Sequence, residues 1–313
     1  MITKYKSGIK VFAPASVANV AVGYDILGFP IEGIGDEVII KKGKQKGLHI
    51  TRIKKNKGLS KDIQKNTAGF AAMKLLQSLG LEDEPIEMEL IKNMEIGTGL
   101  GSSAASAVAG VFGVNTYLNS PLTKAEILRF ATEGEQIADG SFHADNVAPS
   151  LLGGFILIRD NKKLDWTKLP SPAGIKAVVI YPHVKILTKD SRSILSNTVT
   201  LETHINQSGN LASFVAALYK SDLELMRRSL VDLIIEPQRA KLIPHFYDIK
   251  EIALNETALG FSISGAGPSM FALCTNSFIA GNIIEKVESF YADKKIEVTC
   301  YLSNINHEGA KLY

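Results

Sequence analysis

The apolar and polar positions of the first half alternate between the signatures of strands and helices. In residues 86–90 apolar side chains alternate with acids, which is the period of a half-buried strand. Asn66 or Thr67 can cap a helix whose apolar positions share one face. The capping-box pattern of Thr123 and Glu126 begins another helix. Further strands are predicted at residues 38–40, 48–53 and 155–158.

The second half follows a polar, proline-containing stretch, residues 159–174, whose composition is typical of a linker. Beyond it the pattern predicts strands at residues 177–180, 270–274 and 296–302, and helices at residues 211–219, 222–235 and 283–291. Strands and helices are mixed throughout. We therefore expect an α+β chain of two domains, residues 1–168 and 169–313, that face one another across a cleft.

Length and composition exclude several classes of protein. A chain of 313 residues, 45% of them apolar, can bury a core without disulfides, so a disordered or fibrous protein is excluded. The longest uncharged run, residues 96–123, is interrupted by polar side chains, and no apolar segment follows the basic N-terminus. We therefore expect neither a membrane span nor a signal peptide. The prediction is a cytoplasmic protein in which Cys274 and Cys300 are reduced.

The charge of the chain is nearly balanced but unevenly placed. The 35 Lys+Arg against 32 Asp+Glu give +3, too little to indicate a nucleic-acid partner for the whole chain. Residues 41–61 hold eight lysines and Arg52 with no acid. Because no aromatic residue lies among them for base stacking, we interpret them as the solvated edge of a sheet. Nucleic-acid binding is the alternative, and it would be steeply salt-dependent.

The strongest chemical signal is Gly97-Thr98-Gly99-Leu100-Gly101, the glycine loop, followed by Ser102-Ser103-Ala104 at the start of a small-residue helix. Alternate glycines let the backbone approach a ligand, and a helix N-terminus offers free N–H groups to an anion. No lysine follows, so this is not a Walker A loop. A tight turn that only permits close packing is the alternative. No serine lies in Gly-x-Ser-x-Gly and the histidines lack metal-ligand spacing, so hydrolase and zinc sites are not supported.

Two further segments accompany the glycine loop: residues 14–28, with Pro14-Ala15-Ser16 and Gly23-Tyr24-Asp25, and residues 264–269, Ser-Gly-Ala-Gly-Pro-Ser. The three segments, in this order, resemble the three motifs of the GHMP small-molecule kinases. Residues 143–149, 188–192 and 236–239 are similar to segments of the members that phosphorylate homoserine. The resemblance implies a ribosomal S5 domain 2-like N-terminal domain that binds nucleotide and a ferredoxin-like C-terminal domain on the substrate side. It also allows a homodimer.

The resemblance implies ATP-dependent phosphorylation of the homoserine hydroxyl, with Mg²⁺. Residues that would contact the nucleotide are Asn66, Gly97, Thr98, Gly99, Leu100, Gly101, Ser102, Ser103 and Ala104. Ser103 and Glu135 would bind the metal, with Ser102 and Glu133 as the rival ligands. Helix capping alone would also explain Asn66. A kinase for another small alcohol, and a binding protein that has lost catalysis, are the alternative functions.

On the substrate side, the resemblance pairs Arg192 and Arg239 with the carboxylate of the amino acid and Asp25 with its ammonium, which suits their charges. Residues implied to line or orient the substrate are Asn19, Asn146, His143, Thr188 and Gly265. Asn146, Ser103 and Glu135 are the catalytic candidates. Because an amide cannot accept a proton at neutral pH, Asn146 predicts attack without a protein base.

One residue departs from the family pattern. Members often have proline two residues before the first loop glycine, where this chain has Glu95. A carboxylate there would repel bound phosphates unless it points away from them. We therefore expect Glu95 to point to solvent or to alter the geometry at the entry of the glycine loop.

Overall fold

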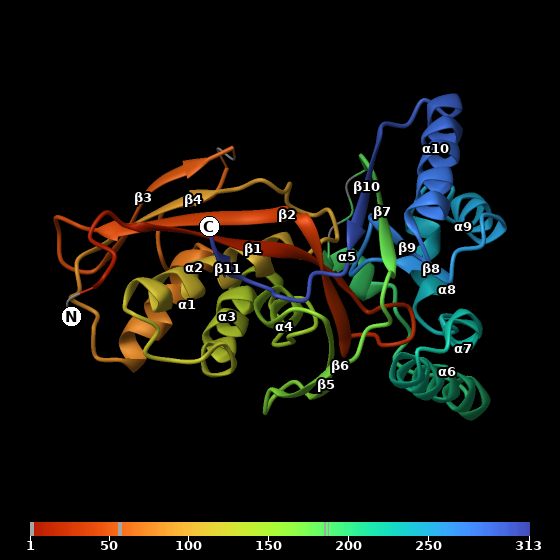
Figure 1. Cartoon of the computed structure of the whole chain (residues 1–313), viewed down its shortest axis with the longest axis horizontal. Coiled ribbons are helices and arrows are strands. Elements are labelled where there is room, and N and C mark those ends of the chain that lie inside the picture. The colour runs from red at the N-terminus through yellow and green to blue at the C-terminus, as the bar shows by residue number, and fades with distance from the viewer. Residues whose placement is uncertain (1–2, 56–57, 185, 187) are drawn as a thin grey trace.

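The computed structural model describes residues 3–55, 58–184, 186 and 188–313 and has two layered α+β parts, as expected (Figure 1). The N-terminal part holds a seven-stranded sheet with the path β11-β1-β2-β4-β3, to which β5 and β6 are joined through β2. Within the described part of this path, β3 and β4 pair in parallel and the other neighbouring strands pair antiparallel. The strands are β1 (Ile9–Ala18), β2 (Leu27–Lys42), β3 (Leu48–Lys54), β4 (Ile86–Ile91), β5 (Phe155–Asp160), β6 (Asp165–Leu169) and β11 (Lys311–Leu312).

Four helices cover one face of this sheet (Figure 1): α1 (Thr67–Ser78), α2 (Ser102–Tyr117), α3 (Lys124–Asp139) and α4 (Val147–Leu152). The predicted caps are confirmed. Asn66 accepts hydrogen bonds from the N–H groups of Ala68 and Gly69, and Thr123 and Glu126 form a complete capping box. Each cap satisfies backbone donors that the first helical turn leaves without partners, so these residues decide where the helices begin.

The alternating pattern of β4 divides its two faces as predicted. Ile86, Met88 and Leu90 are fully buried against the helices. Glu89 lies on the opposite face and pairs with Lys41 (3.2 Å) and Lys54 (3.5 Å) from the neighbouring strands. The basic stretch thus runs from the end of β2 through β3, which is the edge strand of the sheet, so its interpretation as a solvated edge is confirmed for the described residues.

The C-terminal part holds an antiparallel four-stranded sheet in the order β10-β7-β9-β8. Its strands are β7 (Lys176–Pro182), β8 (Gly260–Ile263), β9 (Met270–Cys274) and β10 (Val298–Asn304). The helices are α5 (Thr188–Ser193), α6 (Leu201–Lys220), α7 (Leu223–Ser229), α8 (Glu236–Arg239), the 3₁₀ turn η1 (Ala240–Leu242), α9 (Phe246–Asn255) and α10 (Ser277–Asp293). β11 returns to pair with β1, and the division after residue 168 stays a prediction.

Strands β7, β8 and β9 of the smaller sheet are largely buried on both faces, whereas the edge strand β10 is partly exposed. Val178 and Ala272 point to the core shared with α9 and α10, whereas Val179 and Phe271 point to the core of the N-terminal part. Phe271 packs edge-on against Phe29, with ring centroids 5.9 Å apart. Strands covered on both faces read as continuous apolar runs, which explains why 177–180 and 270–274 show no alternation. The two parts therefore share one large core.

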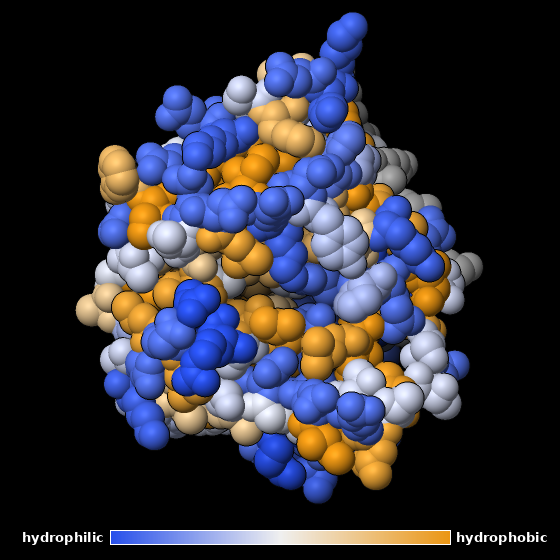
Figure 2. All heavy atoms as spheres, turned by 90° about the vertical axis from the view of Figure 1, so that its right-hand side faces the viewer, coloured by the Kyte–Doolittle hydropathy of each residue, from blue (hydrophilic) through white to orange (hydrophobic). Residues whose placement is uncertain are grey.

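The outer face formed by the C-terminal helices mixes charged and apolar side chains (Figure 2). Single exposed apolar residues there, such as Phe278 at 76% exposure, are ordinary for a protein surface. Cys274 is buried and Cys300 half-buried, both unbridged, and burial raises the pKa of each thiol to about 12. Among the described helices, none combines the length and apolar character needed to cross a bilayer.

Two expectations are wrong. Residues 159–174 are not a linker: β5 and β6 pair in a hairpin because Asp160 accepts the N–H groups of Lys162 and Lys163 and closes a turn. The helix expected over 222–235 ends at Ser229. Asp232 then binds the N–H groups of the following residues and begins a new turn that leads to α8.

The shared core predicts the effect of truncating Phe271. Phe271→Ala removes a fully buried ring that joins both parts, so the free energy of unfolding should fall by about 3–5 kcal/mol. Urea denaturation followed by circular dichroism measures this. Phe278→Ala is the matched control and should change stability by less than about 0.5 kcal/mol. Equal effects of the two substitutions would contradict the shared core.

Candidate active site

A cavity of about 780 Å³ lies where the glycine loop meets the two segments that accompany it in the family resemblance, residues 14–28 and 264–269. One side is formed by the glycine loop and the start of α2, and the other by polar side chains from both parts of the chain. Expected site residues on its lining are Asn19, Asp25, Asn66, Gly97, Thr98, Gly99, Gly101, Ser102, Ser103, Glu135, His143, Asn146, Arg192, Arg239 and Gly265. Leu100 and Ala104 are buried beneath the loop.

Hydrogen bonds join the glycine loop to the two other segments. The N–H of Ser16 donates to the carbonyl of Leu100 (3.1 Å). From the far side, the Ser264 hydroxyl donates to the carbonyl of Gly99 (2.7 Å), and the N–H of Ser269 to that of Thr98 (3.1 Å). Three successive loop carbonyls are therefore bound by chain segments that are distant in sequence, which fixes the backbone of the loop.

The loop glycines are required by space as well as by conformation. Gly99 has φ 81°, and a Cβ there would lie 2.7 Å from the carbonyl oxygen of Ser264. Gly101 has φ 63°, and its Cβ would lie 2.3 Å from the Ser16 hydroxyl and 2.7 Å from the Asn146 amide oxygen. These contacts are far shorter than van der Waals distances, so both positions demand glycine.

Helix α2 begins directly after the loop, at the end of the cavity. Its first N–H groups have no partner within the helix and carry the positive end of the helix dipole. The Ser102 hydroxyl is buried there and has no hydrogen-bond partner among the residues that the structure describes. Buried hydroxyls normally bind a partner, so Ser102 and the helix start together fit an anionic ligand.

A buried ion pair supports this helix from below. The Lys92 ammonium donates to the Asp36 carboxylate, to the carbonyl of Ser102 and to the Ser106 hydroxyl, which uses all three of its protons. Asp36 also accepts the N–H of Asn93 (3.0 Å). Burial lowers the pKa of Lys92, and the Asp36 charge opposes that shift. The sequence analysis missed this pair, because a lysine and an acid 56 residues apart carry no local signal.

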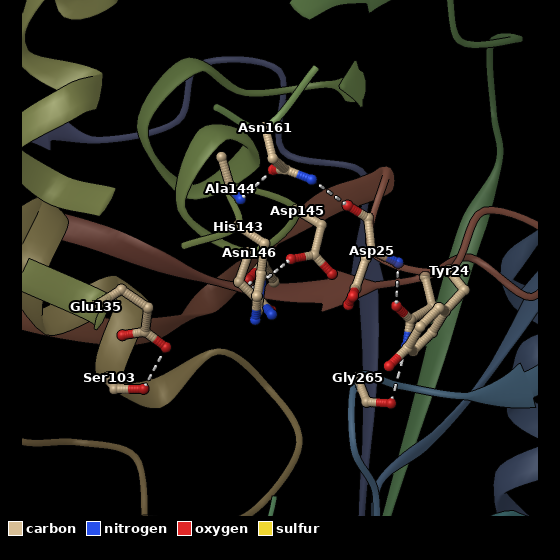
Figure 3. Close-up of polar contacts among 12 residues, drawn as sticks. Tyr24, Asp25, Ser103, Glu135, His143, Ala144, Asp145, Asn146, Asn161 and Gly265 are labelled. Atoms are coloured by element: carbon tan, nitrogen blue, oxygen red, sulfur yellow. Dashed lines mark hydrogen bonds and ion pairs between the residues drawn. The ribbon is translucent and has the colours of Figure 1, made fainter. Parts of the chain in front are cut away.

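The expected metal ligands lie together. The Ser103 hydroxyl donates to the Glu135 carboxylate at 2.7 Å across the α2–α3 contact (Figure 3). Glu133, the rival ligand, instead accepts from Arg129 (3.0 Å) and lines a different groove. Asn66 lines the cavity, but its amide is used by the cap of α1 and by the carbonyl of Ser60. Capping thus explains this asparagine, and its contact with a nucleotide stays a prediction.

The opposite wall carries a chain of charged contacts. Arg192 donates to both carboxylate oxygens of Asp25 (3.1 and 3.2 Å) and to Nε2 of His143 (2.7 Å). Because arginine only donates, His143 bears its proton on Nδ1, which donates to Asp145 (2.7 Å; Figure 3). Asp25, His143 and Asp145 could together hold a metal ion by geometry, but the Arg192 guanidinium already supplies the cation between Asp25 and His143.

Arg239 approaches the same wall from α8 and is buried. It donates to the carbonyls of Ser191 and Gly265 (3.0 Å each) and, at 3.3 Å, to the hydroxyl of Tyr24. The ring of Tyr24 lies under both guanidinium groups, 5.0 Å from that of Arg239 and 5.9 Å from that of Arg192. Burial and the neighbouring Asp25 raise the pKa of Tyr24. The sequence analysis quoted Tyr24 within its motif and assigned it no role.

Amide side chains connect these walls. Asn19 donates to the carbonyl of Gly265 (2.9 Å) and accepts the N–H of Asp25 (3.0 Å). Asn161 bridges the N–H of Ala144 and the carbonyl of Asp25 (Figure 3). Asn161 lies in the stretch that was interpreted as a linker, which is why it was overlooked. Both amides fix the backbone around Asp25.

The remaining expected residues are placed as follows. Asn146 accepts from the Ser16 hydroxyl (2.9 Å), beside Gly101. Thr188 begins α5, but its side chain lies outside the described part of the structure. Glu95 is not directed at the cavity: its carboxylate accepts a hydrogen bond from Tyr181 (3.1 Å). Glu95 is exposed, as expected, but the sequence did not predict its hydrogen bond to Tyr181.

Comparisons with known proteins agree with this geometry. Residues 66–154 match the family model of the GHMP kinases N terminal domain, and residues 214–293 that of the GHMP kinases C terminal domain. The chain belongs to the GHMP kinase family. It is 40% identical to a homoserine kinase from Chlorobium phaeobacteroides (strain BS1), over 96% of this chain and 98% of that protein.

Solved structures of the family support the fold. The crystal structure of homoserine kinase from Cytophaga hutchinsonii superposes with a TM-score of 0.96 at 46% identity, covering 100% of this chain and 99% of that one. A mevalonate kinase structure, at 17% identity, superposes with a TM-score of 0.74 over 96% of this chain and 99% of that one. The second similarity concerns the fold alone. The two-domain GHMP kinase fold expected from the motifs is thus confirmed.

The buried pair beneath α2 predicts a large effect of Lys92→Met. The substitution leaves the Asp36 carboxylate buried without its cation, so the free energy of unfolding should fall by about 3–5 kcal/mol. Urea denaturation measures this, and adding Asp36→Asn should restore part of the loss. Lys46→Met, at an exposed pair with Asp83, is the control and should leave stability almost unchanged. An unaltered midpoint in Lys92→Met would show that the pair is not needed for folding.

Proposed function

We propose that the protein is a homoserine kinase, which transfers the γ-phosphoryl group of ATP to the side-chain hydroxyl of L-homoserine and releases O-phospho-L-homoserine and ADP. This reaction belongs to threonine biosynthesis. The observation that carries the proposal is that two guanidinium groups and a carboxylate, suited to an amino acid, line the same cavity as the glycine loop. Similarity to homoserine kinases over nearly the whole chain supports it.

The substrate would be held by charge on the wall opposite the loop. Arg239 and Arg192 present guanidinium forks that suit the carboxylate of homoserine, and Asp25 suits its ammonium. Without substrate, Arg192 and Asp25 bind one another (3.1 Å), so the amino acid would replace one internal ion pair by two with complementary charges. His143 and Gly265 would line the pocket, and Asn19 acts by fixing the backbone of Asp25.

The nucleotide would place its phosphates against the glycine loop and the start of α2. The partnerless Ser102 hydroxyl and the helix N–H groups would donate to phosphate oxygens. Ser103 and Glu135 offer oxygen donors 2.7 Å apart, which fits magnesium, an ion that takes few protein ligands and keeps waters. When bound, the ion would neutralise part of the phosphate charge. Asn66 and Leu59 line the far end of the cavity, where the base would lie.

Phosphoryl transfer here would depend on position and charge. The homoserine oxygen forms a bond to the γ-phosphorus while the bond to the β,γ-bridging oxygen breaks, and the hydroxyl proton leaves to solvent. Asn146, beside Gly101, would orient the attacking hydroxyl but cannot accept its proton. Asp25 is bound by Arg192 and Asp145 by His143, so both carboxylates are already used. The proposal therefore includes no protein general base.

The proposal also includes a cytoplasmic location, which the cysteines and the absence of a signal sequence predict, and no nucleic-acid partner, which the balanced charge predicts. The resemblance allows a homodimer. The lysines at 41 and 54 support the absence of a nucleic-acid partner, since both bind Glu89 of their own sheet. A flat salt dependence of any DNA or RNA binding would agree with this.

A coupled assay of ADP release across amino alcohols tests the substrate. Homoserine should give saturable turnover, and Arg239→Leu should raise KM for homoserine at least about 100-fold because a charged hydrogen-bond donor is lost. ATP affinity, measured by direct titration, should be retained, which also shows that the variant is folded. Exposed Arg228→Leu is the matched control. Turnover with another alcohol and none with homoserine would favour a different kinase, and binding of both ligands without turnover would favour a binding protein.

A pH profile tests the absence of a base. In single turnovers at saturating substrates, the transfer rate should show no acidic limb from about pH 6 to about pH 8 that depends on a protein carboxylate. Asp145→Asn should leave the shape of this profile unchanged although it loosens His143. A limb in the native enzyme that disappears in Asp145→Asn or Asp25→Asn would identify the base that the proposal excludes.

A further inference from the structure

Glu95 places a negative charge at the entry of the loop that would bind phosphates. It lies two residues before Gly97, and its neighbours Ile96 and Gly97 line the cavity whereas Glu95 does not. The backbone therefore brings an acid to the border of the phosphate site, but the carboxylate itself stays outside the lining. A physical cause must keep it there, because its own side chain is exposed and could adopt other rotamers.

Tyr181 supplies that cause from the other half of the molecule. Its hydroxyl donates to a Glu95 carboxylate oxygen at 3.1 Å, and Tyr181 lies near the end of β7 in the smaller sheet. Burial, followed by the hydrogen bond to Glu95, raises the pKa of Tyr181 to about 12. The phenol therefore keeps its proton, and remains a donor, throughout the pH range in which the protein works.

The ring of Tyr181 is itself fixed. It stacks against His183, with ring centroids 4.6 Å apart, and His183 shares a hydrogen bond with Thr299 of β10 (2.8 Å). Tyr181 and Thr299 are directly paired in the β7–β10 register. The Glu95 charge also reaches Tyr301 of β10, whose pKa is raised by burial first and by Glu95 next. Glu95 thus binds one tyrosine of the smaller sheet and lies near enough to a second to raise its pKa.

We propose that Tyr181 is a positioning residue that draws the Glu95 carboxylate away from the bound phosphates and ties the entry of the glycine loop to the C-terminal sheet. The inference rests on the proposed function, since it concerns nucleotide binding in that site. This role of Tyr181 explains how the protein can have an acid, Glu95, at a position where family members often have proline. Proline stiffens the loop entry by its ring, and here a hydrogen bond between the two domains does so.

The test distinguishes an effect of the Glu95 charge on ATP binding from an effect of the packing of the Tyr181 ring. Tyr181→Phe keeps the ring and removes the donor, so the carboxylate becomes free to approach the phosphates. KM for ATP should rise about fivefold because the Glu95 carboxylate would repel the ATP phosphates, a repulsion that solvent partly screens. The value of kcat should stay within about twofold. Raising the ionic strength to about 1 M should remove most of the difference. The double variant Glu95→Gln/Tyr181→Phe should bind ATP as the native protein does, because no charge remains.

Tyr247→Phe on the exposed side of α9 is the matched control and should change neither constant. Direct titration with ATP reports the same affinities if homoserine proves not to be the substrate, so failure of the proposed function remains distinguishable. An unchanged affinity in Tyr181→Phe would overturn the inference. A loss that persists at high salt and in the double variant would also overturn it, since Tyr181 would then act through packing and not through the carboxylate.

Discussion

The hydrogen bonds that join three loop carbonyls to distant serines are the contacts on which the site depends. Ser16 comes from the first strand, Ser264 and Ser269 from the far end of the chain, and all three bind the backbone of residues 98–100. A loop of alternating glycines has many accessible conformations and would lose much entropy on ordering. Here three hydrogen bonds from the rest of the chain hold the loop in one conformation, so its ordering does not depend on ligand contacts alone.

The shared core extends this rigidity to the whole cleft. Because the smaller sheet is covered on one face by α9 and α10 and on the other by the N-terminal part, the two parts pack against one another through a common core. Phe29, Phe155 and Phe271 pack across the junction. The arginines on one side and the loop on the other are therefore held at a fixed separation, which favours the geometry that phosphoryl transfer needs.

Local patterns predicted local structure, and the motifs predicted the family. The alternation in β4 and the caps Asn66 and Thr123 were readable because each depends on neighbours a few residues away. The hairpin of residues 155–169 was misread, since polar composition resembles a linker when the partner strand is unknown. Glu95 was noticed as a departure, but only the fold shows Tyr181, 86 residues distant, as its partner.

The side chains of the site also fall into two groups, those that sequence motifs indicate and those that only tertiary contacts reveal. Arg192, Arg239 and Asp25 could be assigned because each lies in its own motif, and the fold then brings them together on one wall. Lys92 with Asp36, and Asn161, could not, because each looks like an ordinary surface residue until its tertiary partner is known. Buried polar contacts of this kind are specified by long-range packing, on which periodicity carries no information.

The pairing of β11 with β1 has a consequence for how the protein is made. Strand β1 (Ile9–Ala18) is translated some 300 residues before its neighbour at one edge of the sheet, Lys311–Leu312. For that whole interval β1 has an open flank to which a strand of another nascent chain could add. This edge of the N-terminal sheet is therefore completed only after β11 has been translated.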